Sequence, residues 1–234
     1  MKRLALTSIA LTLGVIALAA QSPDARLERA IGRVEANDAN GLRRILKEDP
    51  ALVRRTDAGI LAQWNWTLLH RAISDSKSLA IVAAIVEAGA PLDAADSEGN
   101  TPLHFAVKRM GREKLPVKDY DGIIRLLIEK KADVHAANAG GATPLHGAAA
   151  SRAEPSAIEM LVQAGAKVNA KALPDVGGWT PLHGATARNS GNLVALLLKL
   201  GADPAATDAN GMTPLQVAER GGFADAAKAL RGSP

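Results

Sequence analysis

Apolar residues recur in short segments of the chain, with the three- and four-residue spacing that places them on one face of a helix. The clearest stripes are Ile81, Val82, Ile85 and Val86, and Leu193, Val194, Leu196 and Leu197. Similar stripes closer to the N-terminus are Leu27, Ala30, Ile31 and Val34, and Leu42, Ile45 and Leu46. Polar turns, such as "DANG" at 208–211, lie between segments of this kind. The pattern predicts a series of short amphipathic helices.

A repeated tetrapeptide accompanies this pattern. "TPLH" occurs at 101–104, 143–146 and 180–183, with the near-copies "TLLH" at 67–70 and "TPLQ" at 213–216. The threonines are 34, 42, 37 and 33 residues apart. A second marker, "GA" in three copies and "KA" in one, ends at Ala90, Ala132, Ala166 and Ala202. The first residue of this marker lies 12, 12, 15 and 12 residues before the next threonine. The long intervals therefore contain insertions into a near-constant unit, one near 110–121 and a smaller one at 172–178.

Helix chemistry explains both markers. Threonine is a good N-cap, and proline suits the first helical position because its missing N–H leaves no bond unmade there. An alanine follows each threonine by five residues, which predicts close contact between helices. These alanines are Ala72, Ala106, Ala148, Ala185 and Ala218. The glycine of "GA" is typical of the left-handed cap that ends a helix.

The "TPLH" boxes, the "GA" caps and the period of roughly 33 residues resemble the ankyrin repeat. The resemblance implies an all-α solenoid of helix–turn–helix units joined by β-hairpin-like loops, with five repeats at 66–232. The segment 24–55 is interpreted as a degenerate N-terminal capping repeat, which lacks "TPLH" as expected of a cap with one side facing solvent. Leu68 and Gln216 depart from the motif in the first and last full units, and Lys131 replaces the cap glycine in the unit with the large insertion.

Composition and charge argue against several functions. Aromatic residues make up only 3% of the chain and cysteine is absent, so packing of aliphatic helices must provide stability without disulfides. The net charge of +4 would be +2 without Lys2 and Arg3, and no long basic run suggests nucleic-acid binding. The chain has no P-loop, G-x-S-x-G, H-E-x-x-H or G-x-G-x-x-G motif. We therefore expect no catalytic residue, no cofactor and no metal.

Residues 1–20 have the features of a secretory signal peptide. Lys2 and Arg3 precede an apolar run at 4–17, and 17–19 form a small-residue cleavage site. We expect cleavage, a periplasmic or secreted protein, and no membrane association afterwards. An uncleaved membrane anchor is the alternative, since a run of about 17 residues is close to the minimum for spanning a bilayer.

Four histidines, His70, His104, His146 and His183, occupy the same position of the repeat. One interpretation is a metal site or a general base. The other, which the resemblance implies, is a hydrogen-bonding link between neighbouring turns. Metal ligands must converge on one ion, whereas equivalent positions in a solenoid are spread along its axis about 8–10 Å apart. The structural interpretation is therefore favoured, and His135 is interpreted as an ordinary polar turn residue.

Tryptophan is the best sequence evidence for binding. Trp66 and Trp179 directly precede a capping threonine, Met212 holds the same position, and Trp64 lies two residues before Trp66. In ankyrin proteins this row lines the concave binding face; the alternative is a ring folded back on its own hairpin. Trp66 and Trp179 are three repeats apart, roughly 30 Å in a regular stack, so we expect a protein partner. The full set of expected partner-binding residues is Trp64, Trp66, Asn100, Lys108, Arg109, Tyr120, Trp179, Arg188 and Met212.

The sequence leaves more than one function open. The favoured hypothesis is a monomeric, exported protein that binds another protein and catalyses nothing. The alternative is an accessory subunit that stabilises or inhibits a periplasmic enzyme. A third hypothesis, an enzyme whose site lies in the 110–121 insertion, is the weakest, because Glu113, Lys114, Asp119 and Tyr120 include no histidine. That insertion is expected to project away from the hairpins.

Overall fold

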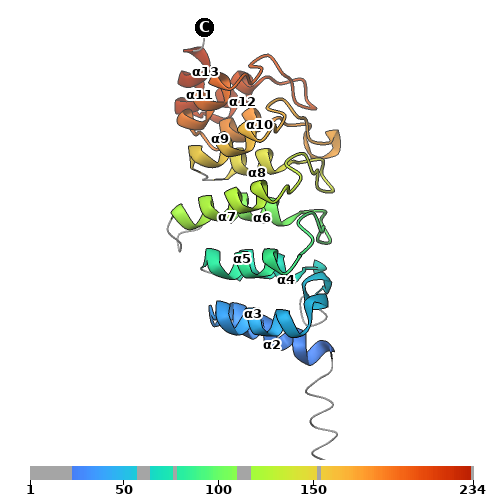
Figure 1. Ribbon diagram of the computed structural model, residues 1–234. Helices are drawn as coiled ribbons and strands as arrows, with labels where there is room; N and C mark the ends of the chain where they lie inside the picture. The colour runs from blue at the N-terminus through green and yellow to red at the C-terminus, as the bar shows by residue number, and fades with distance from the viewer. Residues whose placement is uncertain (1–22, 57–63, 76–77, 110–116, 152–153, 233–234) are drawn as a thin grey trace, which may run out of the picture. The chain divides into compact units, whose positions relative to one another are not determined.

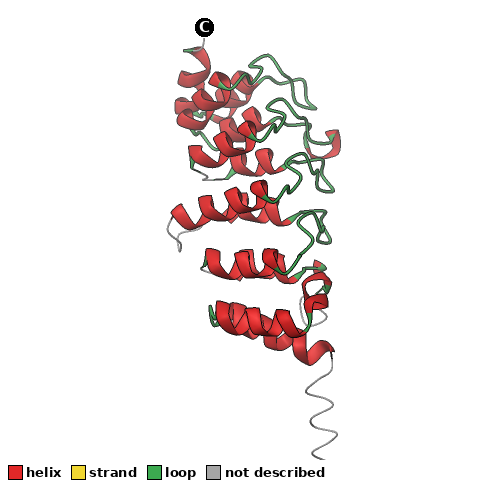
Figure 2. Cartoon of the chain, viewed as in Figure 1, coloured by secondary structure: helices red, strands yellow, loops and turns green. Residues whose placement is uncertain are grey.

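The computed structural model describes residues 23–56, 64–75, 78–109, 117–151 and 154–232, which excludes the predicted signal peptide. The described residues form α-helices, two 3-10 turns and no named strand (Figure 2). The α-helices are α2 (Pro23–Glu35), α3 (Ala39–Glu48), α4 (Leu68–Asp75), α5 (Leu79–Glu87), α6 (Pro102–Arg109), α7 (Val117–Glu129), α8 (Pro144–Ala150), α9 (Pro155–Gln163), α10 (Pro181–Ala187), α11 (Gly191–Lys199), α12 (Pro214–Gly221) and α13 (Ala224–Arg231). The 3-10 turns are η1 (Pro50–Arg54) and η3 (Pro174–Val176). The expected all-α solenoid class is confirmed. None of the helices described is long and apolar enough to cross a membrane.

The chain divides into two compact units, which are described separately. The first comprises residues 1–76 and 80–90, and the second comprises 77–79 and 91–234. In the first unit α2 packs against α3 and α4, and η1 packs against α3 and α4. Their interface buries aliphatic side chains, among them Leu27, Leu42, Leu52 and Leu69. Arg71 on α4 forms an ion pair with Glu35 at the end of α2, at 2.9 Å.

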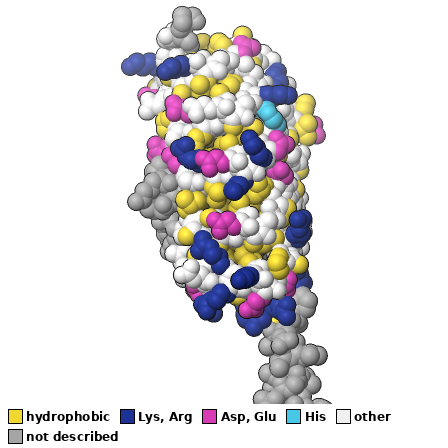
Figure 3. Space-filling view, in the orientation of Figure 1, with side chains coloured by type: hydrophobic (Ala, Val, Ile, Leu, Met, Phe, Trp, Pro, Cys, Tyr) yellow, Lys and Arg dark blue, Asp and Glu magenta, His cyan; other side chains and the backbone are white. Residues whose placement is uncertain are grey.

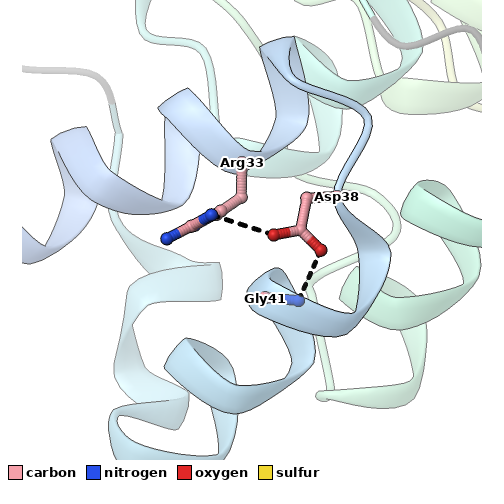
Figure 4. Close-up of polar contacts among 3 residues, drawn as sticks. All are labelled: Arg33, Asp38 and Gly41. Carbon is pink, nitrogen blue, oxygen red and sulfur yellow. Dashed lines mark hydrogen bonds and ion pairs between the residues drawn. The ribbon is translucent and has the colours of Figure 1, made fainter.

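Asp38 caps α3 in this first unit (Figure 4). One carboxylate oxygen accepts the backbone N–H of Gly41 at 2.8 Å, and the other accepts a hydrogen bond from Arg33 at 2.9 Å. The Gly41 amide and the Arg33 guanidinium both favour the ionised carboxylate and together hold the pKa of Asp38 below its usual value. A Cβ at Gly41 would lie 2.2 Å from that carboxylate, so a side chain there would displace the cap.

The second unit is a stack of helix pairs (Figure 1). An inner row contains α6, α8, α10 and α12, and an outer row contains α7, α9, α11 and α13; neighbours within each row are in contact. The hairpin loops lie together on one side of the helices (Figure 1). Prolines begin every helix of the inner row, as the repeat predicts. The five repeat alanines have no exposed surface, which confirms the close packing expected at that position.

Left-handed residues end the outer helices. Gly165 and Gly201 have φ angles of 98° and 92°, and Lys131 takes the same conformation with a φ of 73°. After α11 the Gly201 N–H donates to the Leu198 carbonyl at 3.0 Å, and the next N–H donates to the Leu197 carbonyl at 2.9 Å. This pair of backbone hydrogen bonds is the Schellman motif. Lys131 adopts it without the conformational freedom of glycine.

The large insertion differs from the expectation. Residues 110–116 lie outside the described part of the structure, but α7 begins at Val117 and has 13 residues, against 9 in α9 and 9 in α11. Tyr120 lies in the first turns of α7 with only 3% of its surface exposed. It continues the apolar stripe of Ile123, Ile124 and Leu127, all of which are buried. The expectation that Tyr120 projects from a loop towards a partner is therefore wrong.

Candidate functional site

The hairpins of the second unit are held by aspartate and asparagine side chains, whose oxygens accept hydrogen bonds from backbone N–H groups. Asp96 Oδ1 accepts the N–H groups of Glu98 and Asn100, at 2.9 and 2.7 Å. Asn138 and Asp208 do the same in later hairpins. At Asp208 burial raises the pKa, but the amides of Met212 and Asn210 outweigh it and leave the pKa below its usual value. These turns give the hairpins a fixed shape.

The repeated histidines connect each inner helix to the next hairpin. In α8, the Nδ1 atom of His146 accepts the backbone N–H of Thr143 at 3.1 Å. An amide nitrogen can only donate, so Nδ1 carries no proton and Nε2 must carry it. The Nε2–H group then donates to the Trp179 carbonyl, 3.0 Å away in the next repeat. These contacts confirm the linking role inferred for the histidines.

Two neighbouring histidines have the same arrangement. Nε2 of His104 donates to the Ala142 carbonyl at 2.9 Å, and Nε2 of His183 donates to the Met212 carbonyl at 3.0 Å. Burial lowers the pKa of His104, His146 and His183, more than the carbonyl acceptors raise it. They are therefore neutral near pH 7. Within the described residues, no group of three or more histidine, aspartate or glutamate side chains could hold a metal ion.

A groove of about 350 Å³ lies between the hairpins and the inner helices α6, α8 and α10. Its lining includes Ala142, Ala150, Ala172, Val176 and Trp179, with Lys108 at the α6 side. His104 and His146 lie at its base with their ring nitrogens already used. The groove therefore offers a mainly apolar surface with one cation and no reactive group.

The hollow arises where two neighbouring positions of one repeat both hold small residues. Two positions of the repeat lie side by side: the residue just before the capping threonine and the residue seven after that threonine. Asn100 contacts Lys108 at 3.0 Å, and Met212 contacts Arg220 at 3.7 Å. In the α8 repeat these two positions are Ala142 and Ala150. Glycines at 147 and 184 replace the bulky residue four after the threonine. A Cβ on Gly184 would lie only 3.3 Å from that of Ala150, so this glycine also lets α8 and α10 approach.

The 172–178 insertion builds one wall of the groove. Its turn η3 is fixed to both neighbouring hairpins, because the Leu173 N–H donates to the Gly140 carbonyl at 2.9 Å and the Ala209 N–H donates to the Gly177 carbonyl at 2.9 Å. Leu173 and Val176 are nevertheless 47% and 58% exposed. The two side chains therefore extend the apolar surface of the groove onto a turn that is held in place on both sides.

Trp179 lies at the junction of this insertion and the groove. Its indole packs against Gly177, where an added Cβ would lie 2.9 Å from Nε1 and where φ is 104°. The ring is half-buried and also lines the groove. Both alternatives considered for this tryptophan thus hold in part, since the ring rests on its own hairpin and presents a remaining face to the groove.

Among the described residues that line the groove, Lys108 alone is charged near neutral pH. Its side chain is exposed, and its Nζ donates to the Asn100 amide oxygen at 3.0 Å. Asn100 is only 2% exposed and also bonds to Asp96, Glu98 and Asn138. The expectation that Asn100 contacts a partner is therefore corrected: it is committed to the hairpin and positions Lys108.

The other expected partner-binding residues are dispersed. Trp64 and Trp66 belong to the first unit, where Trp64 is 37% exposed and Trp66 is half-buried. Arg188 is exposed at the end of α10, and Met212 is half-buried beside Arg220. Arg109 is the last residue of α6, and its side chain lies outside the described part of the structure. Of the expected set, only Lys108 and Trp179 line the groove.

Surface charge gives no sign of a larger electrostatic site on the face drawn in Figure 3. Lysine and arginine side chains lie there among aspartate and glutamate side chains, with apolar groups between them (Figure 3). Such a mixed surface is typical of a solvated protein face rather than of a nucleic-acid site.

Comparison with known protein families matches several parts of the chain to ankyrin repeats. Models for single ankyrin repeats match residues 98–139 and 140–173. A model for many copies matches 69–115, and a model for three copies matches 173–233. The chain belongs to the ankyrin-repeat family. Ankyrin repeats are generally non-enzymatic modules for protein–protein interaction, and a partner protein is the class of ligand that they indicate. No curated protein matches the chain.

Proposed function

We propose that this ankyrin protein binds a partner protein through the groove of its second unit, without catalysing a reaction. The observation that carries the proposal is the apolar wall formed by Val176 and Trp179 beside the groove, on a turn that backbone hydrogen bonds fix to both neighbouring hairpins. Hot spots of protein interfaces are enriched in tryptophan that sits in or beside such pockets. The expected second anchor at Trp64 and Trp66 remains part of the proposal.

Comparative capture tests this function. The parent protein and an Ala150→Leu variant, whose added side chain would fill the hollow, are used as baits in an extract of the source cells. Proteins enriched on the parent are purified and titrated against both baits by calorimetry. The proposal expects affinity to fall by about 30-fold or more, the loss typical of a hot spot. A partner that binds both baits equally would place the interaction elsewhere.

Export is a second part of the proposal. Its support is the basic start, the apolar run and the small-residue site of residues 1–20. Fractionation followed by intact-mass measurement tests it: a periplasmic protein lacking about 20 residues is expected, whereas full-length protein in the membrane fraction would indicate an anchor.

Oligomeric state and partner type complete the proposal. We expect a monomer, which sedimentation can check. If the captured partner is an enzyme, its rate and thermal inactivation with and without the ankyrin protein would distinguish an inhibitor or stabiliser from simple tethering.

A further inference from the structure

We propose that the groove recognises a segment of its protein partner in which a bulky apolar residue stands next to an aspartate or glutamate. The apolar side chain enters the hollow, and the carboxylate faces Lys108. This inference rests on the proposed function and names the chemistry of the partner at the same site.

The size and lining of the groove select the apolar residue. A volume of about 350 Å³ is at the small end of the range for ligand sites, so it has room for one large side chain and part of its neighbour but not for a folded element. Ala142, Ala150, Ala172, Val176 and Trp179 supply most of the walls. Their carbon surface gains by contact with leucine, methionine or phenylalanine, whereas a polar side chain would lose hydration without a compensating bond.

Charge selects the neighbouring acidic residue. Lys108 is held at the edge of the hollow by Asn100, and no ion pair joins it to a described residue. Asp96 directs its Oδ1 to hairpin amides, and Glu98 bonds to the Asn100 side-chain amide. Neither carboxylate is part of the groove lining. Among the described residues, the groove lining contains no carboxylate that could pair with Lys108, so a bound carboxylate can meet it from that side.

The rim favours a polypeptide over an enclosed small molecule. Leu173 and Val176 continue the apolar surface past the hollow and remain about half exposed. The same turn is fixed by bonds to the hairpins on either side, so it is a preformed surface. A chain that places one residue in the hollow can cross this rim with its next residues, whereas a molecule confined to the hollow would leave the rim uncovered.

Peptide selection provides the test. A phage-displayed library of random linear peptides is selected on the parent protein, after subtraction on the Ala150→Leu variant. Ala150 is exposed, and its equivalents in two other repeats are Lys108 and Arg220, so a longer side chain is compatible with the fold. Enriched peptides are synthesised with a fluorescent label and titrated by anisotropy. Ala195→Leu and Lys199→Gln, both exposed on α11, serve as matched controls.

The inference expects selected peptides that share an apolar residue beside an acidic one. Lys108→Gln should weaken their binding about two- to fivefold, as expected for a partly exposed ion pair. Lys108→Glu should weaken it further, and the Lys108→Gln variant should lose most of the salt dependence. The two control variants should bind like the parent. Replacing the acidic residue of the peptide by its amide should weaken binding to the parent but not to Lys108→Gln.

Three results would overturn the inference. These are selected peptides without an acidic residue, binding that is indifferent to Lys108→Glu, or no peptide that distinguishes the parent from Ala150→Leu. None of them decides the broader function, which depends on whether the captured partner itself discriminates between parent and Ala150→Leu. A partner that does so while ignoring Lys108→Glu would leave the groove as the binding site and exclude the acidic neighbour.

Discussion

Replacement of His146 by alanine is the sharpest test of how the stack is held together. The side chain is 7% exposed and joins two repeats. It accepts the Thr143 N–H at 3.1 Å and donates to the Trp179 carbonyl at 3.0 Å. Gln216 shows what a substitute must do, because its Oε1 accepts the Thr213 N–H at 2.9 Å in the last repeat.

The expected magnitude follows from these two bonds. Alanine removes both and leaves the Thr143 amide and the Trp179 carbonyl without their partner in a largely buried place. Each lost bond costs about 1 kcal/mol, and an orphaned group can cost about 1–3 kcal/mol. Because some water can enter beside the groove, we expect a loss of about 3 kcal/mol. His146→Gln can retain the first bond and should cost only about 1 kcal/mol.

Equilibrium unfolding of the full chain in urea measures these values. Circular dichroism follows the helices and tryptophan fluorescence follows the hairpins, and the two signals reveal whether the stack unfolds in more than one step. His135→Ala is the matched control: its side chain is exposed in a hairpin, so it should change stability by less than about 0.5 kcal/mol. The argument is refuted if His146→Ala costs no more than His135→Ala, or if alanine and glutamine cost the same.

Four further predictions use other features of the chain. The pKa values of His104, His146 and His183 are lowered in the folded chain, so the unfolded chain takes up protons first as the pH falls. Stability should therefore fall as the pH drops below about 6.5 towards the folded pKa values. Urea midpoints measured at several pH values check this, and a triple His→Gln variant should lessen the fall. Lys131→Gly should stabilise the chain by about 1 kcal/mol in the same assay, since only glycine adopts a φ of 73° without strain. Ala148→Leu should cost about 1–3 kcal/mol by overpacking a position with no exposed surface, and a neutral result would contradict that packing. Asp38→Ala should speed hydrogen exchange in α3 more than Asp38→Asn does, because asparagine keeps an acceptor for the Gly41 amide; equal exchange in the two variants would contradict the role of the cap.

Local chemistry explains why much of the fold could be predicted from the sequence. The Thr-Pro pair marks the start of an inner helix such as α10, and the glycine of "GA" marks the left-handed end of an outer helix such as α11. Both signals depend on the backbone preferences of one or two residues, and four copies of the Thr-Pro pair and three of the cap glycine, all in register, remove most of the ambiguity. The linking role of His146 followed from the same repetition, because equivalent residues cannot converge on one metal ion.

Tyr120 shows where this approach failed. The repeat length predicts a loop for the insertion between the two helices, although Tyr120 stands three and four residues before Ile123 and Ile124 and seven before Leu127. That spacing was sufficient to predict the longer α7, with the tyrosine on its buried face. The hydrophobic period is a more direct indicator of burial than the repeat length, because it depends on which side chains share one face of the helix.

The groove could not be recognised from any single segment of sequence. Gly147, Ala150 and Gly184 each look like ordinary contacts of closely packed helices, and "ALPDVGG" at 172–178 looks like an ordinary turn insertion. A hollow forms only because the hairpin position at Ala142 and the helix position at Ala150 are neighbours in space and are both small in the same repeat. The contacts between Asn100 and Lys108 and between Met212 and Arg220 establish that neighbourhood. Once the pairing is known, it becomes a rule that can be read from sequence: a repeat with small residues at both positions, followed by a repeat with an apolar insertion, should contain a lined groove. In such a solenoid, specificity depends on which repeats lack side chains as much as on which repeats carry them.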